Sequence, residues 1–279
     1  MNCRHTMNRI LTIIASLLLS AFAYAQQLDS ARLAPLDSLL DEYYEAMIYE
    51  AMPTKLQECD FLIESCPDSL VRQWVATRIL QHYMEDPPLM GEEAVAVYLY
   101  DKWFASGRIK IADDWLAFSA QLFVDFNRAS LLGMKAPALE LLPPVGPEKV
   151  TVPEKGIPSV MYFYDASCSK CKVTSIMLPH VLESVSFPLA LVMIYTGQDG
   201  DEWAEFRAGF SCANPNVKII HAWDPEIESD YQKQYGVLTT PKMFLVGTDG
   251  KIEGRRLEVE SLAQLLGIYE SVLENNNQE

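Results

Sequence analysis

In the first half of the chain, apolar residues recur every three or four positions, the spacing that places side chains on one face of an α-helix. The first such stripe comprises Leu33, Leu36, Leu40, Tyr43, Tyr44, Met47 and Ile48. The same spacing predicts helices over residues 29–52, 54–66, 68–84, 92–104 and 113–129. Pro53 is expected to close the first of them, because proline interrupts a helix interior. This pattern predicts an all-α domain over residues 26–130.

Two details of this region are predicted to be structural. Thr54 and Gln57 have the spacing of a capping box that starts the second helix. The last predicted helix carries a stripe of large apolar residues, namely Trp115, Phe118, Leu122 and Phe126. Because such stripes usually pack into a core, no chemistry is assigned to the helical domain. Its expected role is to bind a substrate or partner, or to pack against the rest of the chain.

Beyond residue 130 the pattern changes to short apolar runs that alternate with amphipathic segments. Short strands are predicted in a Pro- and Gly-rich stretch, at residues 138–142 and 149–152. Longer strands follow at 159–164, 189–196, 217–222, 242–246 and 251–257, and helices at 168–185, 200–210, 226–235 and 258–274. Such alternation forms a mainly parallel sheet covered on both faces, and the Asp249-Gly250 turn adds an antiparallel hairpin. Residues 131–279 are therefore predicted to be an α/β domain with a mixed sheet.

The candidate chemistry lies just after the predicted strand 159–164, where two residues separate Cys168 from Cys171. A strand that runs into a helix here places the Cys168 sulfur at the helix N-terminus, where unpaired N–H groups and the helix dipole favour a thiolate. The neighbouring Lys170 and Lys172 add positive charge. Cys171 lies one turn further on, close enough to attack a mixed disulfide at Cys168. The spacing predicts dithiol–disulfide exchange in which Cys168 attacks and Cys171 resolves.

The second half of the chain resembles the thioredoxin superfamily, in particular the exported TlpA-like and ResA-like thiol–disulfide oxidoreductases. The shared motifs are Gly133-x-x-Ala136-Pro137, Cys168-x-x-Cys171, Leu178-Pro179, Tyr235-Gly236-Val237, Thr240-Pro241 and Asp249-Gly250-Lys251-Ile252. They cover about half of the chain. The helical region more loosely resembles a domain fused to such modules in exported Bacteroidetes proteins.

This resemblance implies a thioredoxin-like fold in which a cis-Pro241 packs against the two sulfurs and the backbone of Thr240 pairs with an extended substrate. It implies protein thiols and disulfides as partners, and no cofactor. It also favours a reductant of exported protein disulfides that is recharged by a membrane-linked electron donor. The dipeptide Ser169-Lys170 between the cysteines is typical of neither strong oxidants nor strong reductants, so the residues themselves leave the direction open.

The chain departs from this family where a proton acceptor is expected. Tyr162 stands where thioredoxins carry a buried carboxylate, and Thr174 stands where ResA-like proteins carry a glutamate. Ser167 replaces the usual tryptophan before the first cysteine. The nearest carboxylate is that of Asp165, which we include among the candidate catalytic residues. An aspartate in such a loop also serves as a turn or N-cap residue, and that alternative stays open.

The N-terminus has the pattern of a secretory signal. Arg9 precedes an apolar stretch at residues 10–23, and Ala23 and Ala25 are small residues placed for a cut before Gln26. The stretch is shorter than the about 20 residues of a membrane helix, so a retained anchor is the weaker interpretation. We therefore expect residues 1–25 to be a signal peptide, with no stable membrane anchor after its cleavage and a periplasmic or other extracytoplasmic location.

The charge and the remaining cysteines limit the other possibilities. A net charge of −16 repels phosphate backbones, so no nucleic-acid partner is expected. Cys59 and Cys66 are expected to be buried thiols, although a bend at Pro67 leaves a disulfide between them open. Cys212 is expected to be a lone thiol, with a role as third redox partner as the alternative.

Two other classes of site compete with disulfide exchange. A structural zinc site needs a second pair of ligands beside Cys168 and Cys171, and neither His180 nor His221 is placed to supply it. The module could instead be a redox-inactive scaffold or partner-binding protein in which Cys168 and Cys171 form a static disulfide. A reduction potential and turnover in insulin reduction distinguish this alternative from an enzyme.

Overall fold

The structure is a computed structural model that describes residues 30–85, 87 and 89–276. The predicted signal peptide, residues 1–25, lies outside the described residues. The chain divides into two compact units, Met1–Val124 and Asp125–Glu279. Each unit is described by itself.

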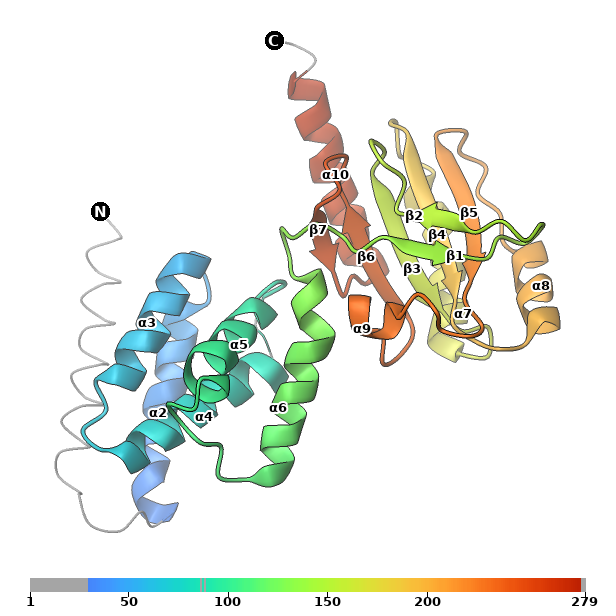
Figure 1. Cartoon of the computed structure of the whole chain (residues 1–279). Coiled ribbons are helices and arrows are strands. Elements are labelled where there is room, and N and C mark those ends of the chain that lie inside the picture. Colours follow the sequence, from blue (N-terminus) through green and yellow to red (C-terminus); the bar gives the residue numbers. More distant parts are fainter. Residues whose placement is uncertain (1–29, 86, 88, 277–279) are drawn as a thin grey trace. The chain divides into compact units, whose positions relative to one another are not determined.

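The first unit is all-helical (Figure 1). Its elements are α2 (Ser30–Met47), α3 (Met52–Glu64), α4 (Ser69–Glu85), α5 (Glu93–Leu99), the π-helical turn η1 (Tyr100–Ala105) and most of α6 (Asp114–Asn127). The side chains at the centre of its core, among them Tyr43, Ile63, Ile79 and Val95, are completely buried. Along each helix, the core residues recur every three or four positions, which is the spacing from which the helices are predicted.

The start of α3 differs from its prediction. The preceding helix ends at Met47, and α3 begins at Met52, so Pro53 lies in the first turn of α3 and does not close α2. Proline is favourable there, because the first N–H groups of a helix have no intrahelical partner to lose. The N-cap residue is Ala51, which makes no side-chain cap. The predicted capping box at Thr54 is therefore wrong.

The apolar stripe that predicts α6 does not face the core, so its expected burial is also wrong. Trp115 is 74% exposed, Phe118 58% and Leu122 36%. Instead, Ala120 lies in the core and Leu116 packs against it. Both sides of α6 carry apolar residues, so their period identifies a helix without identifying its buried face.

A charged pair is buried within this unit. The Lys55 ammonium on α3 donates a hydrogen bond to Glu92, just before α5, and both side chains are 3% exposed. Lys55 Nζ also donates to the Ile48 carbonyl at 2.8 Å, and Glu92 Oε2 accepts from the Leu89 N–H at 3.0 Å. Each charge is thus compensated by its partner and by the backbone, which burial of a charge requires.

Two cysteines of this unit are buried as well. Cys59 lies on α3 and Cys66 follows the end of that helix, and both are present as free thiols. Burial raises the pKa of each thiol to about 12. They therefore behave as small apolar core residues, as expected from the sequence.

The second unit is built on a five-stranded mixed sheet with the order β5-β4-β3-β6-β7. The strands are β3 (Ser159–Tyr164), β4 (Leu189–Tyr195), β5 (Val217–Trp223), β6 (Lys242–Val246) and β7 (Ile252–Arg255). The first three are parallel, whereas β6 and β7 are antiparallel to their neighbours. A separate short hairpin is formed by β1 (Leu139–Leu141) and β2 (Val150–Val152).

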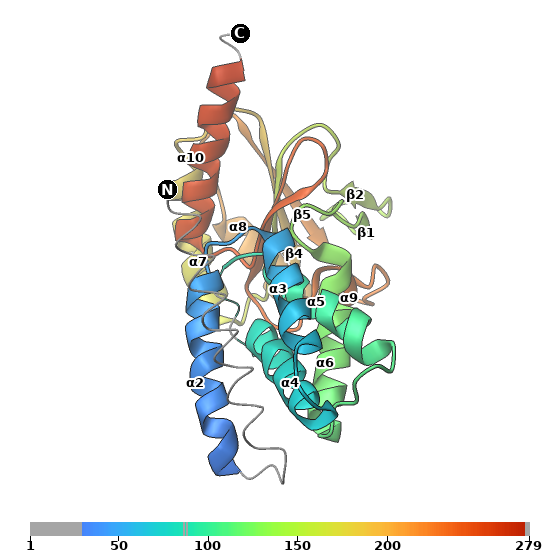
Figure 2. The ribbon, with the colours of Figure 1, turned by 90° about the vertical axis from the view of Figure 1, so that its left-hand side faces the viewer.

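Both faces of the sheet are covered, as Figures 1 and 2 show for this unit. The other elements are η2 (Arg128–Ser130), α7 (Ser169–Leu182), α8 (Gly200–Gly209), α9 (Tyr231–Tyr235) and α10 (Val259–Asn276). Side chains of α7, α8 and α10 share a core with Tyr162 and Tyr164 of β3, while Phe163 faces α9 and the β1–β2 hairpin. Every residue of β3 and β4 is buried, which explains why their sequences are continuous apolar runs.

The predicted fold class is confirmed, since a mixed sheet with helices on both faces follows an all-helical region.

Among the residues that the structure describes, none of the helices combines the length and apolarity needed to cross a bilayer.

Candidate active site

The loop between β3 and α7 is a tight turn that places Cys168 at the start of the helix. The Asp165 carbonyl accepts a hydrogen bond from the Cys168 N–H at 3.2 Å. Its carboxylate Oδ1 accepts from the Ser167 N–H at 2.7 Å and from the Ser167 hydroxyl. The side chain of Asp165 therefore shapes the turn, which is one of the two roles its position predicts.

Cys168 is the N-cap residue of α7. Its Sγ accepts a hydrogen bond from the Cys171 N–H at 3.3 Å, so the sulfur occupies the place of a capping oxygen. Cys168 is partly exposed and Cys171 is completely buried one turn further on. The two sulfurs thus differ in access, with the outer one open to a substrate.

A segment distant in sequence completes the site. The Thr240-Pro241 peptide bond is cis. The Cys168 Sγ lies 3.5 Å from the Thr240 carbonyl oxygen and donates to it. The structure thereby brings together Cys168, Cys171, Thr240 and Pro241. The sequence predicts all four as catalytic residues.

The surroundings separate the two thiols in acidity. Partial burial raises the pKa of Cys168, but hydrogen bonds from the thiol and the backbone N–H of Cys171 outweigh it, so the net pKa lies below the usual value. Burial, followed by the hydrogen bond with the Cys168 sulfur, raises the pKa of Cys171 to about 11. The outer sulfur is therefore the one that ionises first, as nucleophilic attack requires.

Two hydroxyls lie on the inner side of α7. The Tyr162 hydroxyl donates to the Cys171 carbonyl at 3.0 Å and lies 3.3 Å from the Ser175 hydroxyl. Burial raises the pKa of Tyr162. The Tyr162 phenol is thus a neutral group that holds the first turn of the helix.

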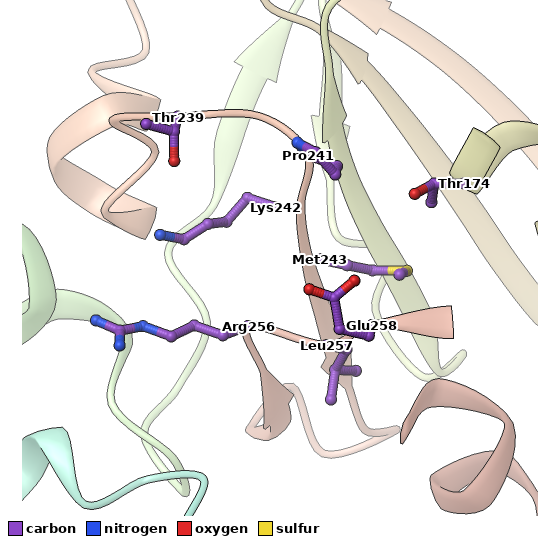
Figure 3. A pocket seen from close by; sticks show the side chains of 8 residues that line it. All are labelled: Thr174, Thr239, Pro241, Lys242, Met243, Arg256, Leu257 and Glu258. Atoms are coloured by element: carbon purple, nitrogen blue, oxygen red, sulfur yellow. The ribbon is translucent and has the colours of Figure 1, made fainter. Parts of the chain in front are cut away.

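A cavity of about 210 Å³ adjoins the cis-proline (Figure 3). It is lined by Thr174, Thr239, Pro241, Lys242, Met243, Arg256, Leu257 and Glu258. Figure 3 shows the Lys242 and Arg256 side chains extending to the same side, with the Glu258 carboxylate below Pro241. These charged residues belong to no recognisable motif, because only the fold brings Lys242, Arg256 and Glu258 together with Thr174 of α7.

One of them contacts the cysteine motif directly. The Lys170 ammonium, between the two cysteines, donates to Glu258 Oε1 at 2.8 Å. The two residues are 88 positions apart. No short motif could have revealed this ion pair.

The other candidate residues lie apart from this site or lack partners for metal binding. Cys212 is partly buried and packs against the core beneath α7 and α8. The His180 side chain is 75% exposed, and burial lowers the pKa of His221 to about 4. Within the described parts of the chain, no three His, Cys, Asp or Glu side chains are grouped so that they could hold a metal ion.

The comparisons with known proteins bear on the fold. No protein-family model and no curated protein sequence matches the chain. The crystal structure of a thioredoxin-like protein from Bacteroides caccae matches with a TM-score of 0.67 and 14% identity, over 88% of this chain and 87% of that one.

Shorter structures match part of the chain. The thioredoxin domain of a thiol-disulfide oxidoreductase from Bacteroides vulgatus matches with a TM-score of 0.42 and 18% identity, over 50% of this chain and 96% of that one. A thiol:disulfide interchange protein from Bacteroides sp. matches with a TM-score of 0.41 and 18% identity, over 50% and 89%. The Bacteroides caccae protein carries the conclusion that the chain has a thioredoxin-like fold together with an additional helical part.

Proposed function

We propose that this protein is an exported thiol–disulfide oxidoreductase that reduces disulfides of other proteins through Cys168 and Cys171. The observation that carries the proposal is the position of the Cys168 sulfur. It caps α7, with the Cys171 N–H at 3.3 Å, and it faces the carbonyl of the cis Thr240-Pro241 bond at 3.5 Å. A thiolate at that point is stabilised by the helix and remains open to a substrate.

The reaction consists of two exchanges. The Cys168 thiolate attacks one sulfur of a substrate disulfide, forms a mixed disulfide and releases the other substrate sulfur as a thiolate, which takes up a proton. Cys171 then loses its proton and attacks the Cys168 sulfur, which releases the second substrate thiolate. Two electrons pass to the substrate, and the enzyme is left with a Cys168–Cys171 disulfide.

The substrate is expected to lie along the cis-proline loop. In this proposal the backbone of Thr240 pairs with an extended substrate segment, and Pro241 packs against the reacting sulfurs. Main-chain pairing of this kind holds a segment without demanding a particular sequence. Protein thiols and disulfides of varied sequence are therefore the proposed partners.

Proton removal from Cys171 is the demanding step, because burial raises the pKa of this thiol to about 11. Asp165 is the proposed acceptor among the side chains, with water as the alternative. The Asp165 carboxylate already accepts a hydrogen bond from Ser167, so it would have to accept the proton while it also holds the turn.

The proposed direction and location follow from the resemblance to exported thiol–disulfide oxidoreductases. A membrane-linked dithiol donor would return two electrons to the Cys168–Cys171 disulfide after each cycle. Residues 1–25 are proposed to direct export to the periplasm or another extracytoplasmic compartment. Residues 26–130 are proposed to bind a substrate or partner or to pack against the thioredoxin-like domain, residues 131–279, and the net charge of −16 favours no nucleic-acid partner.

The central test is to trap the mixed disulfide. A Cys171→Ser protein should accumulate a disulfide between Cys168 and a substrate protein, and Cys168→Ser should trap none. A redox titration in glutathione buffer tests the direction, since a potential above about −150 mV would contradict a reductant. Failure to trap any thiol partner, with no turnover in insulin reduction, would favour the redox-inactive scaffold.

A further inference from the structure

The lysine between the two cysteines is held by a carboxylate from another part of the fold. Lys170 is on the first turn of α7, and its ammonium donates to Glu258 Oε1 at 2.8 Å. Both side chains are about 60% exposed, at 61% and 59%. A pair this exposed contributes little to stability. Lys170 is two residues after Cys168, so the pair sets the charge close to that sulfur.

The backbone fixes Glu258 without using its carboxylate. The Glu258 N–H donates to the Ser261 hydroxyl at 2.9 Å, and the Glu258 carbonyl accepts from the Leu262 N–H at 2.9 Å, which starts α10. The preceding Leu257 N–H donates to the Met243 carbonyl at 3.0 Å, which ties this segment to β6. The carboxylate can therefore be neutralised while the start of α10 keeps its hydrogen bonds.

We propose that Glu258 is a positioning residue that acts through Lys170: by neutralising the Lys170 ammonium, it limits how strongly the Cys168 thiolate is stabilised and keeps the dithiol a better reductant. This inference rests on the proposed function. A nearby positive charge favours a thiolate, and a paired positive charge does so less. A dithiol whose reduced form is more stabilised is the stronger oxidant, so neutralisation of Lys170 shifts the protein toward reduction.

Other charged and titratable groups belong to the elements of the candidate site and must be separated from this effect. They come from β3 and its loop, from α7, from β6 and from the segment before α10, and they are Tyr162, Asp165, Lys170, Cys171, Lys172, Lys242, Arg256 and Glu258. Lys242 and Arg256 line the same cavity as Glu258 (Figure 3). A variant at Glu258 alone would also alter their surroundings, so the test needs a background without the Lys170 charge.

The test measures the pKa of Cys168 directly, in the full-length reduced protein. The rate of alkylation by iodoacetamide is followed against pH for the Cys168-containing peptide by mass spectrometry. Glu258→Gln should lower this pKa by a few tenths of a pH unit, the size expected of one exposed charge at several ångströms. The matched control is Glu260→Gln, which removes the same charge from an exposed residue in the first turn of α10. It should leave the pKa of Cys168 unchanged.

A double-mutant cycle tests whether the effect passes through the lysine. Lys170→Met should raise the pKa of Cys168, and adding Glu258→Gln to it should then change that pKa much less than Glu258→Gln does when Lys170 is present. In glutathione buffer, Glu258→Gln should shift the equilibrium constant toward the dithiol by about twofold. At 29.6 mV per tenfold change, this raises the reduction potential by about 9 mV.

Three results would overturn the inference: no shift with Glu258→Gln, an equal shift with Glu260→Gln, or the same shift when Lys170 is methionine. These failures are distinct from failure of the proposed function, in which Cys168 alkylates normally but forms no exchangeable disulfide with Cys171 or a substrate.

Discussion

The Tyr162 hydroxyl donates a hydrogen bond to the Cys171 carbonyl across 3.0 Å from the buried side of α7. Because burial raises the pKa of Tyr162, this phenol stays protonated and acts as a donor. It can hold the helix turn that carries Cys171, but it cannot accept the proton of that thiol near neutral pH. In the proposed reaction, the proton of Cys171 must therefore leave by another route.

The first prediction concerns the pH dependence of resolution. Burial raises the pKa of Cys171 to about 11, and only its thiolate attacks the mixed disulfide. Burial, the largest cause, persists in the mixed disulfide, so the rate of resolution should rise with pH from pH 7 upward. Attack by Cys168, whose pKa is lowered, should reach its full rate at a lower pH than resolution does. Stopped-flow single turnovers with a fluorescent mixed-disulfide substrate would measure both steps.

A rate of resolution that is independent of pH between 6 and 9 would contradict this prediction. The corresponding control is the attack step measured in the Cys171→Ser protein. It should level off at a lower pH than resolution does, because it reports the Cys168 thiolate alone.

A second prediction is that Thr174→Glu speeds resolution. Thr174 is 6% exposed and lines the cavity beside Pro241, and a carboxylate there would be buried on α7, three residues after Cys171. Burial raises the pKa of a carboxyl group, which suits it to accept a proton near pH 7. A rise on the order of tenfold at pH 7 is expected, below the about 100-fold that an evolved general base supplies. Thr174→Gln, with the same size and no charge, should not reproduce it.

A third prediction separates the two roles of Asp165. Asp165→Asn keeps an oxygen that can accept from the Ser167 N–H, so the turn should survive while the charge is lost. Slower resolution with an unchanged melting temperature would assign the proton to this carboxylate. Ser167→Ala is the control, because it removes one hydrogen bond to Asp165 and leaves the charge in place. If neither Asp165→Asn nor Thr174→Glu changes the pH–rate profile, no side-chain carboxylate is involved.

The strands of the second unit could be predicted because they are buried on both faces. Residues 159–164 form an uninterrupted apolar run, which matches β3 with the same bounds. The turn at Asp249-Gly250 has local chemistry of its own, and Gly250 adopts a positive φ of 80°. Patterns of this kind are short-range, so a single sequence contains them.

The errors arise where the outcome depends on packing partners. The α6 period is as regular on the side of Trp115 as on the side of Ala120, and only the shape of the neighbouring core decides between them. In the candidate site, the ion pair of Lys170 with Glu258 could not be predicted either, because its partners are far apart in the sequence. The cysteine pair and Thr240-Pro241 could be chosen from motifs, whereas the charges that surround them could not.

The last prediction concerns the stability of the helical unit. Lys55 and Glu92 are a buried ion pair, with both side chains 3% exposed. Glu92→Gln would leave the Lys55 ammonium buried without its counter-charge, so it should reduce the free energy of unfolding by about 3–5 kcal/mol. The exposed pair of Arg78 and Asp37, with side chains 46% and 42% exposed, is the matched control, and Asp37→Asn should cost less than about 1 kcal/mol. Urea unfolding followed by circular dichroism measures both.

Replacing the buried pair together, as Lys55→Met with Glu92→Leu, should cost less than Glu92→Gln alone, because no unpaired charge remains in the core. Equal losses for Glu92→Gln and Asp37→Asn would show that the Lys55–Glu92 pair is not buried in solution.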